Sequence, residues 1–309
     1  MELRQLKYFV RIVELRSFSK AAKHLYIAQP ALSKHMAALE AELKTSLLTR
    51  SVRGVTPTEA GLTLYSLAQA LLRQADRIPD EVANASDSPA GVVAIGIPAS
   101  TANILAAPLI RAACARLPRV QLQISEGASG NLEELLASGR LDISLLFERQ
   151  KRAQKLHVRP ILAEDLFFVA SKKLNSGDGD ISLAQVARHP LVLPGLSSTT
   201  RQLADAAFAK AGLAIQVLAE VEATSTMKSI VTDGVGAAIL SRSALYPEQE
   251  DTQLSVRKIV QPELRRGLCL CTSRTAALSR GAECVIELID DTARQLVRDG
   301  VWRNAVEIG

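Results

Sequence analysis

The sequence predicts an α and α/β fold class, in which a small helical unit precedes a larger domain of alternating strands and helices. Three observations support this prediction. The chain has 309 residues, too many for one ordinary hydrophobic core. Apolar residues recur at helical spacing as far as Leu43, which predicts an all-α start. After residue 91, strand-like runs alternate with helical runs, which is typical of α/β domains.

The first 43 residues predict three helices with a tight break before the third. Helical spacing of apolar residues indicates the first helix, with Leu3, Leu6, Phe9, Val10, Val13 and Leu15. Ser17 or Ser19 can cap a short second helix, and residues 26–28 form the break. The third helix opens at Gln29-Pro30, where proline suits a first helical position. This order of elements is the helix-turn-helix plan.

A two-stranded wing is predicted directly after the third helix. The segments LLTRS (47–51) and GVTPT (54–58) are short and β-prone, and Arg53 lies at the basic tip between them. Thr58 then precedes Glu59 and a long helix. The N-terminal unit is therefore expected to be a winged helix-turn-helix.

The long helix carries apolar residues at the spacing of a coiled-coil seam. They follow one another at intervals of 4, 3, 4, 3 and 4 residues: Leu64, Ala68, Leu71, Ala75, Ile78 and Val82. This stripe predicts pairing with a second copy of the chain, although a helix packed on its own domain would also explain it. Pro79 interrupts the pattern and tends to kink a helix, because it removes one backbone hydrogen bond. Residues 83–91 predict a linker.

The remainder of the chain predicts two α/β lobes, because its sheet content is too large for one small sheet. Strands are expected at 92–97, 120–125, 142–147, 166–170, 191–194, 215–221, 237–241 and 267–272. Helices are expected at 103–117, 131–138, 183–188, 200–212, 225–233 and 276–299.

The charge distribution favours a nucleic-acid partner for the N-terminal unit. The first sixty residues contain ten Lys or Arg and five Asp or Glu, whereas the rest contains 27 of each. The whole net charge of +5 therefore lies in that unit, as in nucleic-acid binders. No apolar run is long enough for a membrane span, and the start MELRQLKYFV lacks the pattern of a secretory signal. A cytoplasmic protein is expected, with Cys269 and Cys271 as buried thiols.

Residues 3–61 resemble the N-terminal signature of the LysR-type transcriptional regulators. The resemblance rests on LKYFVRIVELRSFSKAAKHLYIAQPALSKHMAALEAEL, followed by LLTRSVRGVTPTEAG. Three later stretches look like a subgroup that resembles the nitrogen assimilation control regulator: GIPAS (96–100), EGASGNLEELLASGRLDISLLFE (126–148) and EDLFFVA (164–170).

The resemblance implies a dimerising linker helix and a two-lobed α/β effector domain similar to periplasmic solute-binding proteins. It implies these limits: 1–58 for the winged helix-turn-helix, 59–90 for the linker helix and hinge, 91–163 plus 268–304 for one effector lobe, and 164–267 for the other. The partners it implies are double-stranded DNA, a small-molecule effector and RNA polymerase. The chain would assemble as a homodimer through the linker helix, and then as a homotetramer.

DNA recognition is expected from the third helix, whose N-terminal end would enter the major groove. The resemblance carries contact roles onto Gln29, Pro30 and Ser33, and Lys34 and His35 project from the same side. Lys34 stands where many relatives have Arg, so bidentate reading of guanine is weaker there. Four further contacts to the DNA backbone or minor groove are expected from Ser17, Arg50, Arg53 and Thr56. A solvated charged face is the alternative.

An effector site is expected where small polar clusters join strand ends to helix starts. Ligands of open α/β sheets bind beyond the carboxyl ends of strands, and helix N-termini there attract anions. The expected contacts are Ser100, Thr101, Ala128, Ser129, Phe147, Ser197, Ser198, Thr199 and Thr224. A small anion, such as a carboxylate, is the expected effector. The alternative is that these Ser and Thr residues simply cap helices.

The sequence favours a regulator over an enzyme. It contains no GxSxG elbow, Walker A loop or HExxH motif, and its four His residues show no metal-ligand spacing. No catalytic residue, metal or cofactor is therefore expected. Two other classes of protein fit less well. A solute-capture protein fits the two lobes but not the DNA-binding unit, and an intracellular enzyme would need a catalytic constellation that the sequence lacks.

Overall fold

The computed structural model describes residues 1–51, 54–83, 89–148, 156–174, 177–247, 253–274 and 276–308. It divides into two compact units. The N-terminal unit comprises residues 1–86 with 138–140, and the C-terminal unit comprises residues 87–137 with 141–309. Each unit has its own hydrophobic core.

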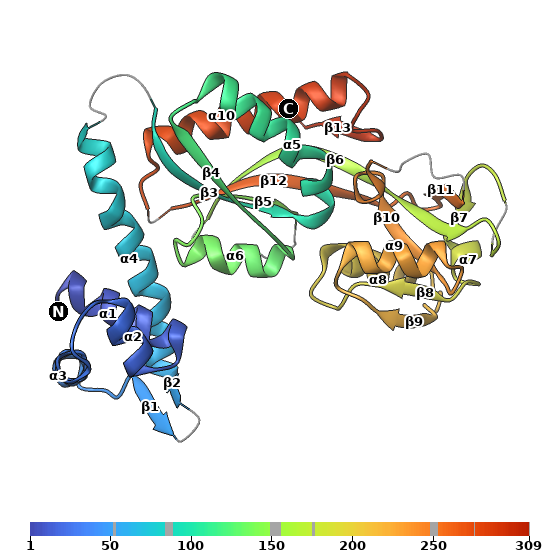
Figure 1. Cartoon of the computed structure of the whole chain (residues 1–309). Helices are drawn as coiled ribbons and strands as arrows, with labels where there is room; N and C mark the ends of the chain where they lie inside the picture. Colours follow the sequence, from blue (N-terminus) through green and yellow to red (C-terminus); the bar gives the residue numbers. More distant parts are fainter. Residues whose placement is uncertain are drawn as a thin grey trace. The chain divides into compact units, whose positions relative to one another are not determined.

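The N-terminal unit contains the expected winged helix-turn-helix (Figure 1). Its elements are α1 (Leu3–Leu15), α2 (Phe18–His24), α3 (Gln29–Leu43), β1 (Leu48–Ser51), β2 (Gly54–Pro57) and α4 (Glu59–Ala83). The Ser17 hydroxyl caps α2 by accepting a hydrogen bond from Lys20 N at 3.3 Å. Phe9, Ile12 and Leu32 are fully buried where the first three helices meet. The sequence prediction of these elements is confirmed.

The wing is an antiparallel hairpin, in which Leu48 pairs with Pro57 and Ser51 pairs with Gly54. Buried Val55 anchors β2 on the helices, and its N–H donates to Arg16 O at 3.0 Å. Gly61 lets α4 start against the wing, because a Cβ at that position would lie 2.0 Å from Leu47 O. The hairpin is thus held at a fixed place within the N-terminal unit by backbone contacts.

Helix α4 continues past Pro79 to Ala83, so the proline does not end it. The first two positions of the predicted seam, Leu64 and Ala68, are wrong. Ala68 is 1% exposed and Leu64 packs against the core of the N-terminal unit, so both are covered by their own chain. The exposed apolar stripe includes Leu67, Leu71 and Ile78, which are 62%, 41% and 59% exposed. The predicted linker at 83–91 falls largely outside the described residues, which exclude 84–88.

The C-terminal unit is an α/β structure built on one long mixed sheet. Its strands are β3 (Gly91–Pro98), β4 (Val120–Gly127), β5 (Ile143–Phe147), β6 (Leu156–Ser171), β7 (Ile181–Ser182), β8 (Leu191–Leu193), β9 (Val217–Glu220), β10 (Ala237–Ser241), β11 (Leu254–Val260), β12 (Arg265–Ser273) and β13 (Ala305–Glu307). Its helices are α5 (Ala99–Arg116), α6 (Ser129–Ala137), α7 (Leu183–Val186), α8 (Thr199–Lys210), α9 (Thr224–Thr232), η1 (Ser243–Leu245) and α10 (Arg280–Arg298).

Strand β6 joins two lobes of the C-terminal unit (Figure 1). Its first part pairs with β12 as far as the pair Asp165 and Arg265, and its last part, 166–171, pairs with β10 and β11. We call lobe I the group β3, β4, β5, α5, α6, α10 and β13, with β12 and the β6 residues up to Asp165. We call lobe II the group β7 to β11, α7 to α9 and the rest of β6. The first passage between the lobes is therefore a continuous strand, and the chain returns to lobe I between β11 and β12.

Each lobe has a separate core. Ile95, Ile143 and Trp302 are buried in lobe I, and Phe168 and Phe208 are buried in lobe II. Parallel pairing of β3 with β4 and β5, and of β8 with β9 and β10, places helices after the carboxyl ends of these strands. This arrangement gives four strand-to-helix junctions, two in each lobe, at which small polar residues occur.

Three expectations for the C-terminal unit need correction. Helix α5 starts at Ala99 rather than near residue 103, because Pro98 serves as its N-cap. Strand β6 is longer than the predicted 166–170, and β7, β11 and β13 were not predicted. No helix in the described part of the chain is long and apolar enough to cross a membrane. The described residues also contain no cluster of three His, Cys, Asp or Glu residues that could hold a metal ion.

Candidate functional site

Helix α3 presents an exposed polar end that fits the expected recognition surface. Gln29, Pro30 and Lys34 are exposed, and Ser33 is half-buried on the same helix. The Gln29 Nε2 amide donates a weak hydrogen bond to Ser33 Oγ at 3.4 Å, so the two side chains share one face. Pro30 occupies the first turn of α3, where its missing N–H costs no helix bond. The polar groups of this face remain available to a partner.

His35 and Arg50 make contacts within the N-terminal unit. The His35 ring packs edge-on against Tyr8, with 5.3 Å between ring centroids. The Arg50 guanidinium lies over the Phe18 ring, 4.1 Å from its centroid. These contacts orient both side chains. Thr56 is exposed on β2, and Arg53 lies outside the described residues.

Tyr26 is an exposed residue next to α3 in the chain, and it was not among the expected DNA contacts. It lies in the turn between α2 and α3, is 95% exposed, and has a φ of +55°. An aromatic side chain gains nothing from such exposure in an isolated unit, and a left-handed backbone disfavours a bulky residue. The sequence feature that could have pointed to Tyr26 is an aromatic residue inside a turn that otherwise favours Gly or Asn.

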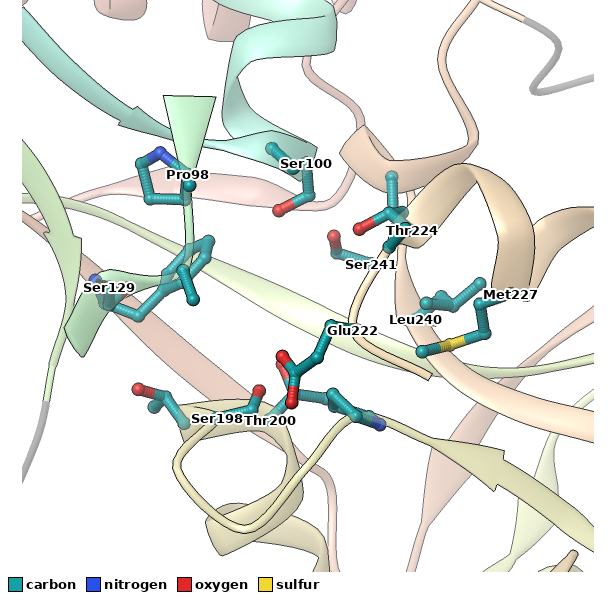
Figure 2. Close-up of a pocket in the computed structure, with 18 of the residues that line it drawn as sticks. Pro98, Ser100, Ser129, Ser198, Thr200, Glu222, Thr224, Met227, Leu240 and Ser241 are labelled. Atoms are coloured by element: carbon teal, nitrogen blue, oxygen red, sulfur yellow. Dashed lines mark hydrogen bonds between the residues drawn. The ribbon is translucent and has the colours of Figure 1, made fainter. Parts of the chain in front are cut away.

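A cavity of about 580 Å³ lies between lobe I and lobe II (Figure 2). It brings together eight of the nine residues expected to contact an effector: Ser100, Ala128, Ser129, Phe147, Ser197, Ser198, Thr199 and Thr224. The structure does not place Thr101 in the cavity, so the expectation that it contacts an effector is wrong. Thr101 is fully buried and does not line the cavity. It follows Ser100 on α5, and successive residues of a helix point in different directions, so its side chain faces the interior of lobe I.

Four helices, α5, α6, α8 and α9, begin at this cavity. Their first backbone N–H groups have no partner within the helix, as at every helix start. In α8, for example, the first helix bond runs from Gln202 N to Ser198 O. Ser198 is the N-cap of α8 but its side chain makes no capping bond, and Pro98 and Ala223 cap α5 and α9 without a side-chain bond. The cavity therefore collects positive helix ends.

One buried arginine connects both lobes at the cavity. Arg266, on β12, donates from Nη2 to Ser100 Oγ at 2.9 Å and from Nη1 to Thr200 Oγ1 at 2.8 Å. Ser100 belongs to lobe I and Thr200 belongs to lobe II. Nη2 also donates to Ser241 Oγ at 2.8 Å. The guanidinium lies 3.6 Å from the centroid of the Phe147 ring, which it covers.

The charge of Arg266 is balanced by Glu164, which is 2% exposed on β6. Arg266 Nε donates to Glu164 Oε1 at 2.8 Å, while Ser243 Oγ and Trp302 Nε1 donate to Glu164 Oε2 at 2.7 Å and 3.2 Å. All partners of this ion pair are thus supplied by the protein, as a buried pair requires. Arg266 was not among the expected site residues, because an arginine near a strand start ordinarily indicates a solvated edge.

Two carboxylates also line the cavity: Glu126 near the end of β4 and Glu222 between β9 and α9. Both residues are exposed. Figure 2 draws Glu222 between Ser100 and Ser241 on one side and Ser198 and Thr200 on the other. The cavity therefore combines positive helix ends, hydroxyl groups and two negative side chains.

Two families match this chain in sequence. Residues 3–62 match the family described as bacterial regulatory helix-turn-helix protein, lysR family, and residues 86–294 match the LysR substrate binding domain. The nitrogen assimilation regulatory protein nac of Klebsiella aerogenes is 35% identical to this chain over 290 residues, which cover 94% of each protein. The protein of the same name from Escherichia coli strain K12 matches with the same identity and coverage. These relatives are named regulators, not enzymes.

Solved structures share the fold over nearly the whole chain. A full-length OxyR variant from Pseudomonas aeruginosa superposes with a TM-score of 0.73 at 21% identity, covering 100% of this chain and 99% of that chain. Full-length CbnR complexed with its target DNA superposes with a TM-score of 0.72 at 22% identity, covering 96% of this chain and 99% of that chain. The architecture of a helix-turn-helix followed by a two-lobed α/β domain is therefore common to all three.

Proposed function

Because the chain belongs to the LysR family of transcriptional regulators, with a DNA-binding helix-turn-helix unit and an effector-binding domain, we propose that a small anionic effector in the cavity between lobes I and II controls its binding to specific DNA. The observation that carries the regulator assignment is the match of both domains in one chain. The observation that supports an anionic effector is the convergence of four helix starts on one cavity of ligand size.

An effector carboxylate would accept hydrogen bonds from free N–H groups at these helix starts. Ser129 and Ser198 would add hydroxyl donors from lobes I and II, so a bound anion would be held by both lobes at once. Arg266 would contribute little net charge, since Glu164 neutralises it. The positive helix ends, rather than a free cationic side chain, would therefore provide the attraction.

DNA binding would follow the plan of other helix-turn-helix proteins, with the start of α3 in the major groove. Gln29 and Ser33 would contact base edges there, while Lys34 would contribute a point charge. Arg50, Arg53 and the other wing and cap residues would contact the DNA backbone or minor groove. The exposure of Gln29, Pro30 and Lys34 supports this role.

The proposed dimer pairs α4 with α4 of a second copy through the exposed stripe of Leu67, Leu71 and Ile78. Two such dimers would form a homotetramer. Pairing would hold two recognition helices at a fixed separation, so the half-sites would lie about one or two DNA turns apart. The regulator would act in the cytoplasm, where its DNA is, and would contact RNA polymerase when bound beside a promoter.

Effector binding would change how far the two lobes close on each other. One lobe would comprise about residues 91–163 plus 268–304, and the other about residues 164–267. Residues 1–58 would bind DNA, and residues 59–90 would form the linker helix and hinge. A ligand shifts such an equilibrium only by its difference in affinity for the two closures. Contacts from both lobes to one anion would provide that difference, and the tetramer would pass it on to the bending of the DNA.

A gel-shift assay with the region upstream of the protein's own gene tests the proposal. Full-length protein is incubated with this duplex at low salt, alone and with succinate, 2-oxoglutarate or benzoate as carboxylate probes. We expect a retarded complex whose mobility or affinity changes with at least one carboxylate. No retarded complex under any of these conditions would contradict DNA regulation, and a complex that ignores all carboxylates would contradict the anionic effector.

The identity with two nitrogen assimilation regulatory proteins supports a narrower proposal, that the target genes include genes of nitrogen metabolism. Transcript levels in a deletion strain, grown with limiting and with excess ammonium, test this point. We expect a group of transcripts to respond to the deletion only under one nitrogen supply. A response that is independent of nitrogen supply would contradict it.

A further inference from the structure

The cavity between the lobes carries negative side-chain charge that the protein leaves unbalanced. Glu126 and Glu222 both line it, and within the described residues neither one forms an ion pair. Arg266 is the sole cationic side chain among the described lining residues, and Glu164 already balances it. A purely anionic ligand would therefore be attracted by the helix starts but repelled by the two carboxylates.

Glu222 differs in this respect from its close neighbour Glu220. Glu220 has a cationic partner, because Arg201, which is 8% exposed, donates to Glu220 Oε1 at 2.8 Å as well as pairing with Asp205. Glu222 instead accepts a hydrogen bond from the backbone N–H of Gly195 at 3.2 Å. A backbone N–H fixes a carboxylate without cancelling its charge. The Glu222 carboxylate is thus positioned on the cavity wall and remains free to bind a cation.

The absence of a side chain at Gly195 makes room for this contact. A Cβ at residue 195 would lie 2.3 Å from Glu222 Oε1, far closer than atoms can approach. Any other residue would push the carboxylate off the loop before α8. The pairing of Gly195 with Glu222 therefore places a negative charge at one particular point of the cavity.

One residue of the cavity wall carries a buried polar atom without a hydrogen-bond partner in the described structure. Thr199 is 5% exposed and lines the cavity, and its Oγ1 has no hydrogen-bond partner in the described structure. A buried hydroxyl without a partner costs free energy until something binds it. It lies in the first turn of α8, the helix whose preceding loop carries Gly195.

Resting on the effector site proposed above, we propose that the effector is a small zwitterion of the α-amino acid type. Its ammonium group donates to the Glu222 carboxylate. Its carboxylate binds at the starts of α5 and α6 in lobe I, beside Ser100 and Ser129. One ligand thereby matches the positive helix ends and one of the two uncompensated carboxylates, and a cavity of about 580 Å³ holds a molecule of this size with some water.

Isothermal titration calorimetry on the full-length protein tests this inference with a defined panel. The panel contains the twenty standard L-amino acids, and each amino acid that binds is compared with its deaminated carboxylic acid and with its methyl ester. We expect at least one amino acid to bind. Removal of either charge is expected to weaken binding about tenfold or more, as for other hydrogen bonds to charged groups.

Two variants locate the ammonium site. Glu222→Gln keeps the shape and removes the charge, so it is expected to weaken the amino acid about tenfold or more but not its deaminated acid. Gly195→Ala displaces the carboxylate and is expected to act in the same direction. Glu287→Gln, on the exposed face of α10, is the matched control and should leave both affinities unchanged.

Three results would overturn the inference: no binding by any amino acid of the panel, equal binding of an amino acid and its deaminated acid, or unchanged affinities in Glu222→Gln. Tight binding of deaminated acids alone would overturn the zwitterion and leave the anionic effector standing. Failure of the chain to bind DNA would overturn the proposed function whatever the cavity binds.

Discussion

Arg266 and Glu164 form a buried ion pair at the junction of lobes I and II, with 2.8 Å between Nε and Oε1 and 2.5 Å between Nη2 and Oε1. Their exposed fractions are 7% and 2%. The remaining donors of the guanidinium reach one helix start in each lobe, at Ser100 and Thr200. The pair therefore links both lobes through hydrogen bonds at the cavity.

Removal of one partner of this pair is expected to destabilise the protein. Glu164→Gln leaves the Arg266 charge buried and uncompensated, which costs about 3–5 kcal/mol in comparable cases. Urea unfolding of the full-length protein measures the effect. The double variant Glu164→Gln with Arg266→Met removes both charges and is expected to be more stable than the single variant. Equal stability of Glu164→Gln and the unchanged protein would contradict the description of this pair.

Substitutions at the start of α3 should separate base reading from charge attraction. Gln29→Ala is expected to cost about 1–3 kcal/mol on the specific site and little on scrambled DNA. Lys34→Ala, which removes a charge, is expected to weaken binding to both duplexes and lower the salt slope by about one. Fluorescence anisotropy with both duplexes measures these changes. Lys210→Ala, an exposed lysine at the end of α8, is the matched control, and a similar loss there would contradict the assignment.

Replacing Tyr26 should weaken DNA binding without lowering stability. Asn tolerates a φ of +55° better than Tyr, so Tyr26→Asn is expected to leave the melting temperature unchanged or raised. The loss of an exposed phenol beside α3 is expected to weaken DNA binding. Thermal unfolding and anisotropy on the same samples check both effects. A variant that binds DNA as tightly as the unchanged protein would show that Tyr26 does not contact DNA.

The exposed stripe on α4 should control dimerisation. Leu71→Lys places a charge in the proposed pairing surface of both copies and removes two Leu side chains, each 41% exposed in the single chain, that the dimer would bury further. The dimer dissociation constant is therefore expected to rise more than about 100-fold. Analytical ultracentrifugation measures it. Asp76→Lys adds the same residue on another side of α4 and should leave the dimer intact, while a monomer in both variants would point to general unfolding.

Lobe II should lose stability in mild acid because of His189. Burial, and to a lesser degree the charge of Arg257, lowers the pKa of His189 below its ordinary value of about 6.5. The unfolded chain then binds the proton more readily, so the free energy of unfolding falls as the pH drops below about 6.5. Urea midpoints at pH 7 and pH 5 measure this, and His189→Gln should remove part of the difference. An equal difference in both proteins would exclude His189 as its source.

The N-terminal unit could be predicted almost element by element, because its signals are local. Ser17 caps α2 through Lys20 N, three residues away, and Pro30 marks the start of α3. The stripe on α4 was less predictable. The spacing that links Leu64 to Leu71 is the same whether a residue meets a second chain or its own domain, and only the packing of α1 on α4 decides between them.

The cavity could be predicted in part. Polar junctions after parallel strands indicated Ser100, Ser129 and Ser198, because topology places such junctions at one edge of a sheet. The role of Arg266 could not be predicted, since its partner Ser100 lies 166 residues away in the sequence. The full length of β6 was also missed, because Glu164 interrupts an apolar pattern and is buried only through that distant arginine.

Sequence-specific DNA binding is tested most directly by an anisotropy titration of the full-length protein on two labelled duplexes, one from the region upstream of its gene and one with the same bases scrambled. We predict at least about a thousandfold preference for the first duplex at physiological salt. We also predict that the logarithm of affinity falls linearly with the logarithm of salt concentration. Equal affinity for both duplexes, or no binding at low salt, would contradict a sequence-specific regulator.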